Sequence, residues 1–139
     1  MIGDGELHAE IETKIKSLGL EQTITLCGFQ KNPYSILKHS KMLCMPSSWE
    51  GFGLAAVEAM ALGKPVVASP VGGLGNIVND SCGYLCNDEE EFVNAILEMF
   101  ADFNVYEQKC IGAIERANDF DNIQNYSNKM KSLYQVVID

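Results

Sequence analysis

Three short, continuously apolar segments separated by helical patterns constrain the fold of this 139-residue chain more than any other feature. Residues 42–45, 66–68 and 83–86 are of strand length, and Gly, Pro or acidic residues stand close to their ends. Strands that are apolar throughout, rather than at alternate positions, are typical of parallel sheets buried on both faces. We therefore predict an α/β fold with a Rossmann-like parallel sheet and helices on both of its faces.

The remaining segments favour helices and one further strand. Residues 23–27 are rich in β-branched side chains and precede Gly28, which predicts a fourth strand. Asp88 and Glu91 form a capping-box pattern at the start of one helix. Apolar residues at helical spacing predict helices over residues 7–18, 33–37, 54–62, 88–100, 106–117 and 122–137, with a short turn of helix around Ile77.

The composition indicates an ordinary globular protein and excludes several classes of function. Hydrophobic residues make up 47% of the chain, and its length suits one domain, predicted over residues 1–139. Ten Lys and Arg against nineteen Asp and Glu give a formal charge of −9, which disfavours binding to nucleic acid or to an anionic membrane surface. The sequence shows neither a signal peptide nor an apolar run long enough to span a bilayer.

Five scattered cysteines fit the reducing cytoplasm, where we expect the protein to reside. Cys27 and Cys44 lie in apolar runs and are predicted to be small core residues. Cys82 and Cys86 have no second cysteine pair and no nearby His to complete a zinc site, so no such site is expected.

Residues 46–60 carry the most informative pattern in the chain. A predicted strand ends at Pro46, a loop with Glu50 follows, and Gly51 and Gly53 lead directly into an apolar helix. Glycines leave backbone N–H groups uncovered, and the helix dipole favours an anion at this end of the helix. We therefore expect an anionic group to bind where the helix starts.

Glu50 and Glu58 flank the start of that helix. Glu58 is the only charged residue between Leu54 and Leu62, where a buried carboxylate needs a hydrogen-bonding or cationic partner. Eight residues at ~1.5 Å each separate the two glutamates by at most roughly 12 Å, about the span of a nucleotide-sugar diphosphate. Glu58 would then suit vicinal ribose hydroxyls, and Glu50 the sugar end. The spacing alone leaves a second interpretation open, in which Glu50 is a loop charge and Glu58 a salt-bridged core residue.

The two glutamates form an E-x7-E motif within PSSWEGFGLAAVEAMALGKPVVAS, which resembles the donor-binding, C-terminal half of family 4, or group 1, glycosyltransferases. The opening GDGEL, the LCGFQKN stretch, the VGG after Pro70 and the late Gly83 follow in the family's order. The resemblance covers residues 2–97. It implies the GT-B fold and transfer of a hexose-type sugar, with retention, from a nucleotide sugar to a glycan or a lipid-linked acceptor.

The resemblance also implies a role for each matching residue. Glu58 resembles the glutamate that binds the donor ribose, and Glu50 resembles the catalytic glutamate that holds the transferred sugar. Gly28 and Phe29 lie where the family binds the nucleobase, usually through backbone contacts. The resemblance implies neither a metal nor a cofactor. The segment that holds the sugar and the β-phosphate together with Glu50 corresponds to Gly51, Phe52, Gly53 and Leu54.

The chain departs from the family pattern in two respects. Asn76 stands where the family usually has a glutamate after the Gly-Gly pair. The Arg and Lys that grip the donor diphosphate, and the whole acceptor-binding domain, belong upstream of the segment that matches GDGEL. We therefore expect an incomplete, N-terminally truncated C-terminal half. Its expected partners are a nucleotide-sugar donor and an acceptor-binding domain on a missing segment or a separate chain.

The sequence leaves two functional hypotheses open. In the first, the chain is the donor-binding part of a glycosyltransferase, binds its donor weakly and is inactive alone, while the parent enzyme reaches membranes through its other half. In the second, the chain is a non-catalytic remnant or interaction domain of the same fold that binds no donor. An exposed sheet edge would then favour self-association.

Overall fold

This computed structural model describes residues 1–120. The backbone divides into two compact units, Met1–Ile36 and a second that begins at Leu37, and each unit is described by itself. The helix predicted over residues 122–137 lies outside the described residues.

The first unit is built around α1, His8–Ser17, which buries Ile15. As predicted, this helix ends before Gly19, whose φ of +66° takes the chain out of the helix through the left-handed region. α2, Tyr34–His39, begins in this unit. The side chain of Asn32 caps it, because its Oδ1 accepts a bond of 3.2 Å from the first N–H of the helix.

The strand predicted over residues 23–27 is wrong, because no strand forms there. High β-propensity produces a strand only where a neighbouring strand is paired alongside. This segment makes only a few backbone hydrogen bonds to the first residues of the chain, too few for a ladder of paired strands. Cys27 is therefore half-buried rather than part of a core. The backbone hydrogen bonds to the first residues run from Met1 N to Thr25 O, from Cys27 N to Met1 O at 2.8 Å and from Gly3 N to Gly28 O at 2.9 Å.

The second unit contains a parallel sheet of three strands in the order β1 (Leu43–Met45), β2 (Val66–Ala68) and β3 (Gly83–Leu85). The three apolar runs are confirmed as strands, each within one residue at either end. β2 is buried along its whole length, as a central parallel strand requires. Cys44, predicted as a core residue, is exposed, because β1 is an edge strand in the described part of the chain.

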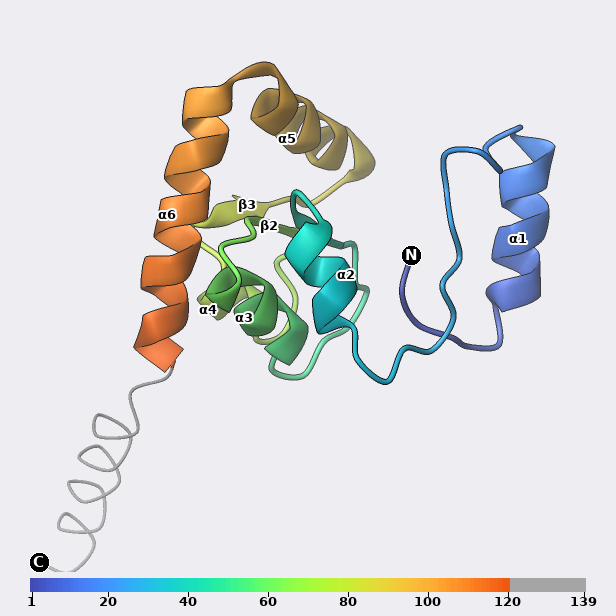
Figure 1. The fold of residues 1–139 in the computed structure, drawn as a ribbon, viewed down its shortest axis with the longest axis horizontal. Coiled ribbons are helices and arrows are strands. Elements are labelled where there is room, and N and C mark those ends of the chain that lie inside the picture. The colour runs from blue at the N-terminus through green and yellow to red at the C-terminus, as the bar shows by residue number, and fades with distance from the viewer. Residues whose placement is uncertain (121–139) are drawn as a thin grey trace, which may run out of the picture. The chain divides into compact units, whose positions relative to one another are not determined.

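Helices cover both faces of this sheet (Figure 1). Val66 and Ala68 point to one face, where residues of the third, fourth and sixth helices pack on them. Val67 points to the other face and packs against residues of the fifth helix. The predicted α/β architecture is therefore confirmed. The four helices are α3 (Leu54–Ala61), α4 (Leu74–Ile77), α5 (Glu89–Ala101) and α6 (Phe103–Phe120).

The capping box at the start of α5 is confirmed, with one change of partner. Asp88 Oδ1 accepts a bond of 2.9 Å from the Glu91 N–H, as the pattern predicts. The Glu91 carboxylate reaches back one residue further, to Asn87, and accepts from its N–H at 2.7 Å and from its side-chain amide at 3.0 Å. These bonds satisfy donors at the helix start and place negative charge where the helix dipole favours it.

Lys109 ties α6 to the start of β3. Its side chain is buried, and its ammonium donates to the carbonyl oxygens of Asp80 at 2.8 Å and Gly83 at 3.2 Å. The ammonium also lies 3.8 Å from the centroid of the Tyr84 ring. These contacts compensate a charge that would otherwise be costly to bury. Burial nevertheless lowers the pKa of Lys109, against the opposing effect of Asp80 and Glu98.

We expect stability to fall as the pH rises from about 10 to about 12, because two tyrosines resist ionisation in the folded chain. Burial raises the pKa of Tyr84, and likewise that of Tyr106, from 10.0 to about 12. Above pH ~10 the unfolded chain loses phenolic protons that the folded chain keeps, so the free energy of unfolding declines with pH. Lys109 has the opposite effect, but only up to its unfolded pKa of ~10.4.

Thermal unfolding followed by circular dichroism at several pH values between about 9 and 12 measures this decline. Replacing both tyrosines, Tyr84→Phe with Tyr106→Phe, is expected to flatten it, because phenylalanine has no proton to lose. A decline of the same steepness in the double variant would contradict the assignment to these two side chains.

Candidate functional site

Two loops meet at the carboxyl edge of the sheet, which is where open α/β sheets bind their ligands. The first loop, residues 46–53, follows β1, and the second loop, residues 69–73, follows β2. The Ser69 N–H donates to the Met45 carbonyl across 3.1 Å, and the Gly73 N–H donates to the Gly51 carbonyl across 2.8 Å. Backbone bonds therefore join the second loop to the end of β1 and, further along, to the first loop.

Gly72 and Gly73 allow the second loop to touch the first backbone to backbone. A Cβ on Gly72 would lie 1.7 Å from the Glu50 carbonyl oxygen, and a Cβ on Gly73 would lie 2.0 Å from the Phe52 carbonyl oxygen. Gly72 also has a φ of +52°, a conformation that L side chains rarely adopt. A side chain at either position would require the first loop to move.

α3 begins directly after this contact. Its N-cap is Gly53, in the left-handed conformation with φ of +92°, and no side chain in the described part of the chain caps it. The N–H groups of a first helical turn have no partner within the helix, and the helix dipole favours a negative charge beside them. The start of α3 is therefore suited to an anion, as the sequence pattern predicts.

The Glu50 carboxylate accepts a hydrogen bond from one of the N–H groups of the first loop. Its Oε1 accepts a bond of 3.0 Å from the Gly51 N–H. Glu50 is half-buried and Gly51 is exposed. A carboxylate oxygen and a phosphate oxygen are both anionic acceptors, so a phosphate that used this N–H would have to displace Glu50.

Glu58 lies one helical turn after Leu54 and is half-buried. Residues four apart share a face of a helix, so Glu58 and the exposed Leu54 lie on the same side of α3. The buried side of α3 is formed by Ala56, Ala59 and Met60. Glu58 therefore lies at the edge of the core, on the same side of α3 as Leu54, the first residue of the helix.

Six of the eight predicted site residues belong to the second unit and lie within the first loop and α3. Gly28 and Phe29 belong to the first unit, where Gly28 has a φ of +61° and the Phe29 side chain is 75% exposed. The six residues are Glu50, Gly51, Phe52, Gly53, Leu54 and Glu58.

Sequence reasoning missed two residues of α6, Phe120 and Arg116. Phe120 contacts the first loop, and Arg116 contacts α4, the helix that follows the second loop. The Phe120 ring meets the Phe52 ring edge-on, with 6.1 Å between centroids, and the Arg116 guanidinium lies 4.8 Å from the Phe120 centroid. Arg116 also donates to carbonyl groups at the end of α4. No local pattern marks either residue, although Arg116 is the one arginine in the sequence.

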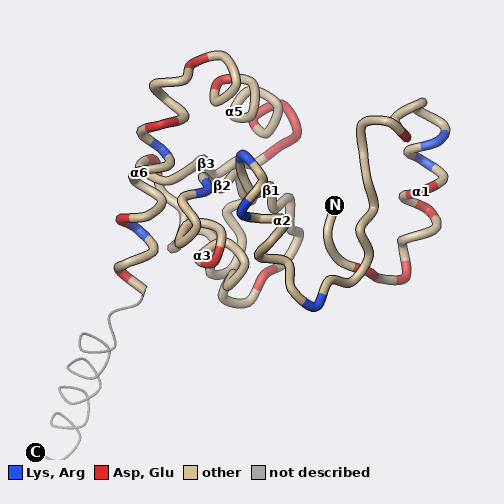
Figure 2. The backbone as a smooth tube through the Cα atoms, viewed as in Figure 1, with Lys and Arg blue, Asp and Glu red and all other residues tan. Residues whose placement is uncertain are grey.

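Backbone N–H groups and two carboxylates are the polar groups that define this site. Lys and Arg are dispersed over several elements of the described chain, and acidic residues are densest at the start of α5, where Asp88 is followed by three glutamates (Figure 2). Among residues 1–120, no group of three or more His, Cys, Asp or Glu is placed to hold a metal ion. None of the helices in the same part of the chain is long and apolar enough to cross a membrane.

Comparisons with known proteins show the family. The family of glycosyl transferases group 1 matches residues 1–116. The chain is 33% identical over 140 residues to a UDP-Gal:alpha-D-GlcNAc-diphosphoundecaprenol alpha-1,3-galactosyltransferase of Escherichia coli, a match that covers 96% of this chain and 35% of that protein. The chain therefore belongs to the group 1 glycosyltransferases, and it spans about a third of the length of the curated relatives it matches.

Solved structures agree with this assignment. The crystal structure of Anabaena HepE in complex with UDP and glucose matches with a TM-score of 0.81 at 26% identity, over 94% of this chain and 39% of that one. The C-terminal domain of a group 1 glycosyltransferase from Francisella tularensis matches with a TM-score of 0.72 at 27% identity, over 82% of this chain and 62% of that one. The predicted resemblance to the C-terminal, Rossmann-like part of a GT-B glycosyltransferase is confirmed.

Proposed function

We propose that this chain binds the nucleotide-sugar donor of a retaining glycosyltransferase, which transfers a hexose-type sugar to a glycan or a lipid-linked acceptor. One observation carries the proposal: two loops in backbone contact frame the uncapped start of α3, with Glu50 just before it and Glu58 one turn into it. Helix-start N–H groups between two carboxylates match a diphosphate that joins a ribose to a sugar.

Two relatives support the class of donor. The crystal structure of HepE, which has a similar fold, is of a complex with UDP and glucose. The Escherichia coli relative has UDP-Gal as the donor in its name and a diphosphoundecaprenol-linked sugar as the acceptor. Both names fit a nucleoside-diphosphate sugar as the ligand of this chain.

Each site residue has a part in the proposed complex. Glu58 accepts hydrogen bonds from the vicinal hydroxyls of the ribose. The backbone N–H groups of residues 51–54 hold the β-phosphate, and Glu50 lies against the transferred sugar. For Gly28 and Phe29, which belong to the first unit, contact with the nucleobase stays a prediction from the family resemblance. Within the second unit, side-chain carboxylates are proposed for the hydroxyl groups and backbone groups for the phosphate.

The proposed catalysis is electrostatic. Transfer breaks the bond between the anomeric carbon and the β-phosphate oxygen and forms a bond from that carbon to an acceptor hydroxyl oxygen, whose proton passes to the leaving diphosphate. In the transition state, negative charge therefore develops on the diphosphate and positive charge on the sugar. N–H groups of residues 51–54 would stabilise the first charge, and the Glu50 carboxylate the second. The proposal includes neither a metal ion nor a cofactor, since the helix start itself supplies partial positive charge.

We also propose that a second domain, on the same polypeptide or on a separate one, binds the acceptor. The curated relatives are about three times as long as the part of them that this chain covers, which leaves room for such a domain. The chain alone would then transfer no sugar. A cytoplasmic location is proposed on the five free cysteines of the described residues.

NMR titration of the isotope-labelled chain with UDP tests donor binding. We expect the amide resonances of Gly51, Gly53 and Gly73 to shift with a dissociation constant on the order of 1 mM or below. Uridine, which lacks the diphosphate, is the matched ligand control and should shift these amides far less. If these amide resonances do not shift at about 10 mM UDP, ten times the expected dissociation constant, donor binding is refuted and the non-catalytic hypothesis is supported.

Glu50→Gln is expected to tighten UDP binding about fivefold, or by about 1 kcal/mol. In the free chain the Glu50 carboxylate occupies the Gly51 N–H, so it competes with the diphosphate and repels its charge. Glutamine keeps the size of the side chain and removes the charge. The same UDP titration measures the effect, with Glu107→Gln, an exposed carboxylate on α6, as the control. Weaker binding by Glu50→Gln would show instead that the carboxylate helps to hold the nucleotide.

A further inference from the structure

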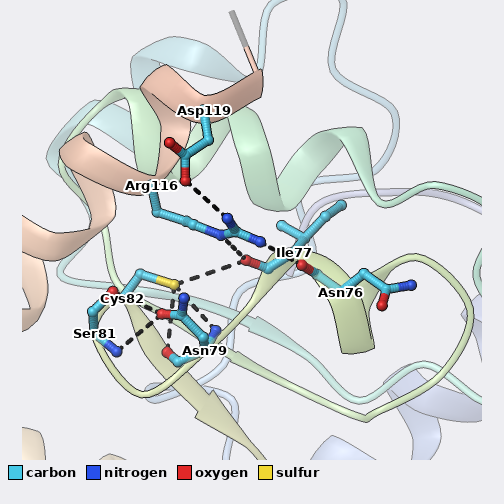
Figure 3. Close-up of polar contacts among 7 residues, drawn as sticks. All are labelled: Asn76, Ile77, Asn79, Ser81, Cys82, Arg116 and Asp119. Carbon is cyan, nitrogen blue, oxygen red and sulfur yellow. Dashed lines mark hydrogen bonds and ion pairs between the residues drawn. The ribbon is translucent and has the colours of Figure 1, made fainter. Parts of the chain in front are cut away.

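Arg116 joins α6 to the end of α4 (Figure 3). Its side chain is only 24% exposed. Nε donates to the Ile77 carbonyl at 2.9 Å, Nη2 donates to the Asn76 carbonyl at 2.5 Å, and Nη1 pairs with the Asp119 carboxylate at 2.8 Å. The last carbonyl groups of a helix have no partner within the helix, so a charged donor stabilises the end of α4.

The same guanidinium reaches the first loop through two aromatic rings. It lies 4.8 Å from the centroid of Phe120, and the Phe120 ring meets the Phe52 ring edge-on, with an interplanar angle of 85°. Both geometries are attractive. Phe52 stands between the two glycines of the first loop, and its carbonyl oxygen lies against the Gly73 backbone. Arg116 is therefore linked to both sides of the contact between the loops.

We infer that Arg116 is a positioning residue for the nucleotide site, an inference that rests on the proposed function. α4 is four residues long and begins immediately after Gly73, so holding its last carbonyl groups also limits where Gly73 can lie. Phe52, held by Phe120, limits the first loop in the same way. Arg116 thus holds the second loop against the first and keeps the N–H groups of residues 51–54 in place for the diphosphate, although its own side chain is engaged elsewhere.

Lys109 provides a matched control on the same helix. It too donates from α6 to two backbone carbonyl groups, those of Asp80 and Gly83. These carbonyl groups belong to the start of β3 and the segment before it, and not to the two loops. Lys109→Met therefore removes bonds of the same kind from α6 without a contact to either loop.

UDP titration of the full 139-residue chain, followed on the Gly51 and Gly73 amides, compares the variants. We expect Arg116→Met to weaken UDP binding about tenfold or more, and Lys109→Met to change it less than about twofold. Arg116→Lys should fall between them, since lysine keeps the charge but lacks the planar fork that bonds two carbonyl groups and stacks on a ring. In spectra without ligand, Arg116→Met should shift the amide resonances of both Gly51 and Gly73, and Lys109→Met should shift neither.

Several results would overturn the inference. One is UDP affinity in Arg116→Met equal to that of the parent chain, and another is an equal loss in Lys109→Met. If the parent chain binds no UDP, the proposed function fails, and the ligand-free amide shifts then decide the positioning role on their own. If Arg116→Met does not fold, Arg116→Lys and Phe120→Leu take its place. Phe120→Leu keeps an apolar side chain but removes both ring contacts, so an unmoved Gly51 amide in it would contradict the link.

Discussion

Gly73→Ala is expected to destabilise the chain strongly and to abolish UDP binding. A methyl group on Gly73 would lie 2.0 Å from the Phe52 carbonyl oxygen and 2.6 Å from its carbonyl carbon. Backbone atoms cannot rotate away as a side chain can, so the two loops must separate. The 2.8 Å bond from the Gly73 N–H to the Gly51 carbonyl would be lost with them. Overpacking and one lost hydrogen bond together cost about 3 kcal/mol, or about 10 °C in Tm for a chain of this size.

Gly75→Ala is the matched control for this variant. Gly75 is exposed, lies two residues further along in α4, and a Cβ there would meet only Pro70 atoms at 3.7 Å or more, an ordinary contact. Alanine also favours a helix over glycine by up to about 1 kcal/mol. We therefore expect an unchanged or slightly higher Tm and unchanged UDP affinity. Calorimetry and UDP titration of the two variants make the comparison, and equal Tm values would contradict the backbone contact.

The sheet could be predicted from the sequence because its strands carry their signal locally. β2 is buried on both faces, so each of its residues is apolar, and Pro65 and Gly83 mark where β2 and β3 begin. Residues 23–27 have equally good β-propensity, yet they form no strand. Propensity describes a side chain that fits a sheet, and the presence of a neighbouring strand is a property of the tertiary structure.

The site was predictable in part for the same reason. Gly51 and Gly53 mark a loop that enters a helix, and that pattern is local. The requirement for glycine at position 73 comes from the Phe52 carbonyl, and the requirement for a donor at position 116 comes from the end of α4. Such requirements arise only when the chain is folded. The roles assigned to the glutamates came from the family resemblance, since a loop carboxylate and a sugar-binding carboxylate look alike in a sequence.

Glu58→Ala is expected to weaken UDP binding about a hundredfold, or by about 2.7 kcal/mol. The Glu58 carboxylate is proposed to accept two hydrogen bonds from ribose hydroxyls, and the net contribution of a bond to a charged group is about 1.5–3 kcal/mol, so the expected loss corresponds to at least one such bond. Alanine is the better helix former, so α3 itself should persist. Thermal unfolding measured alongside the UDP titration separates lost binding from lost structure.

A nucleotide that lacks the 2′-hydroxyl gives the sharper test of Glu58. The parent chain should bind deoxy-UDP about tenfold more weakly than UDP, because one of the two hydroxyl bonds is missing. Glu58→Ala should bind the two nucleotides equally, since the carboxylate that distinguishes them is gone. This comparison is made within each protein, so a change in stability affects both nucleotides alike and cancels. A Glu58→Ala chain that still prefers UDP to deoxy-UDP would show that the ribose is recognised by other residues.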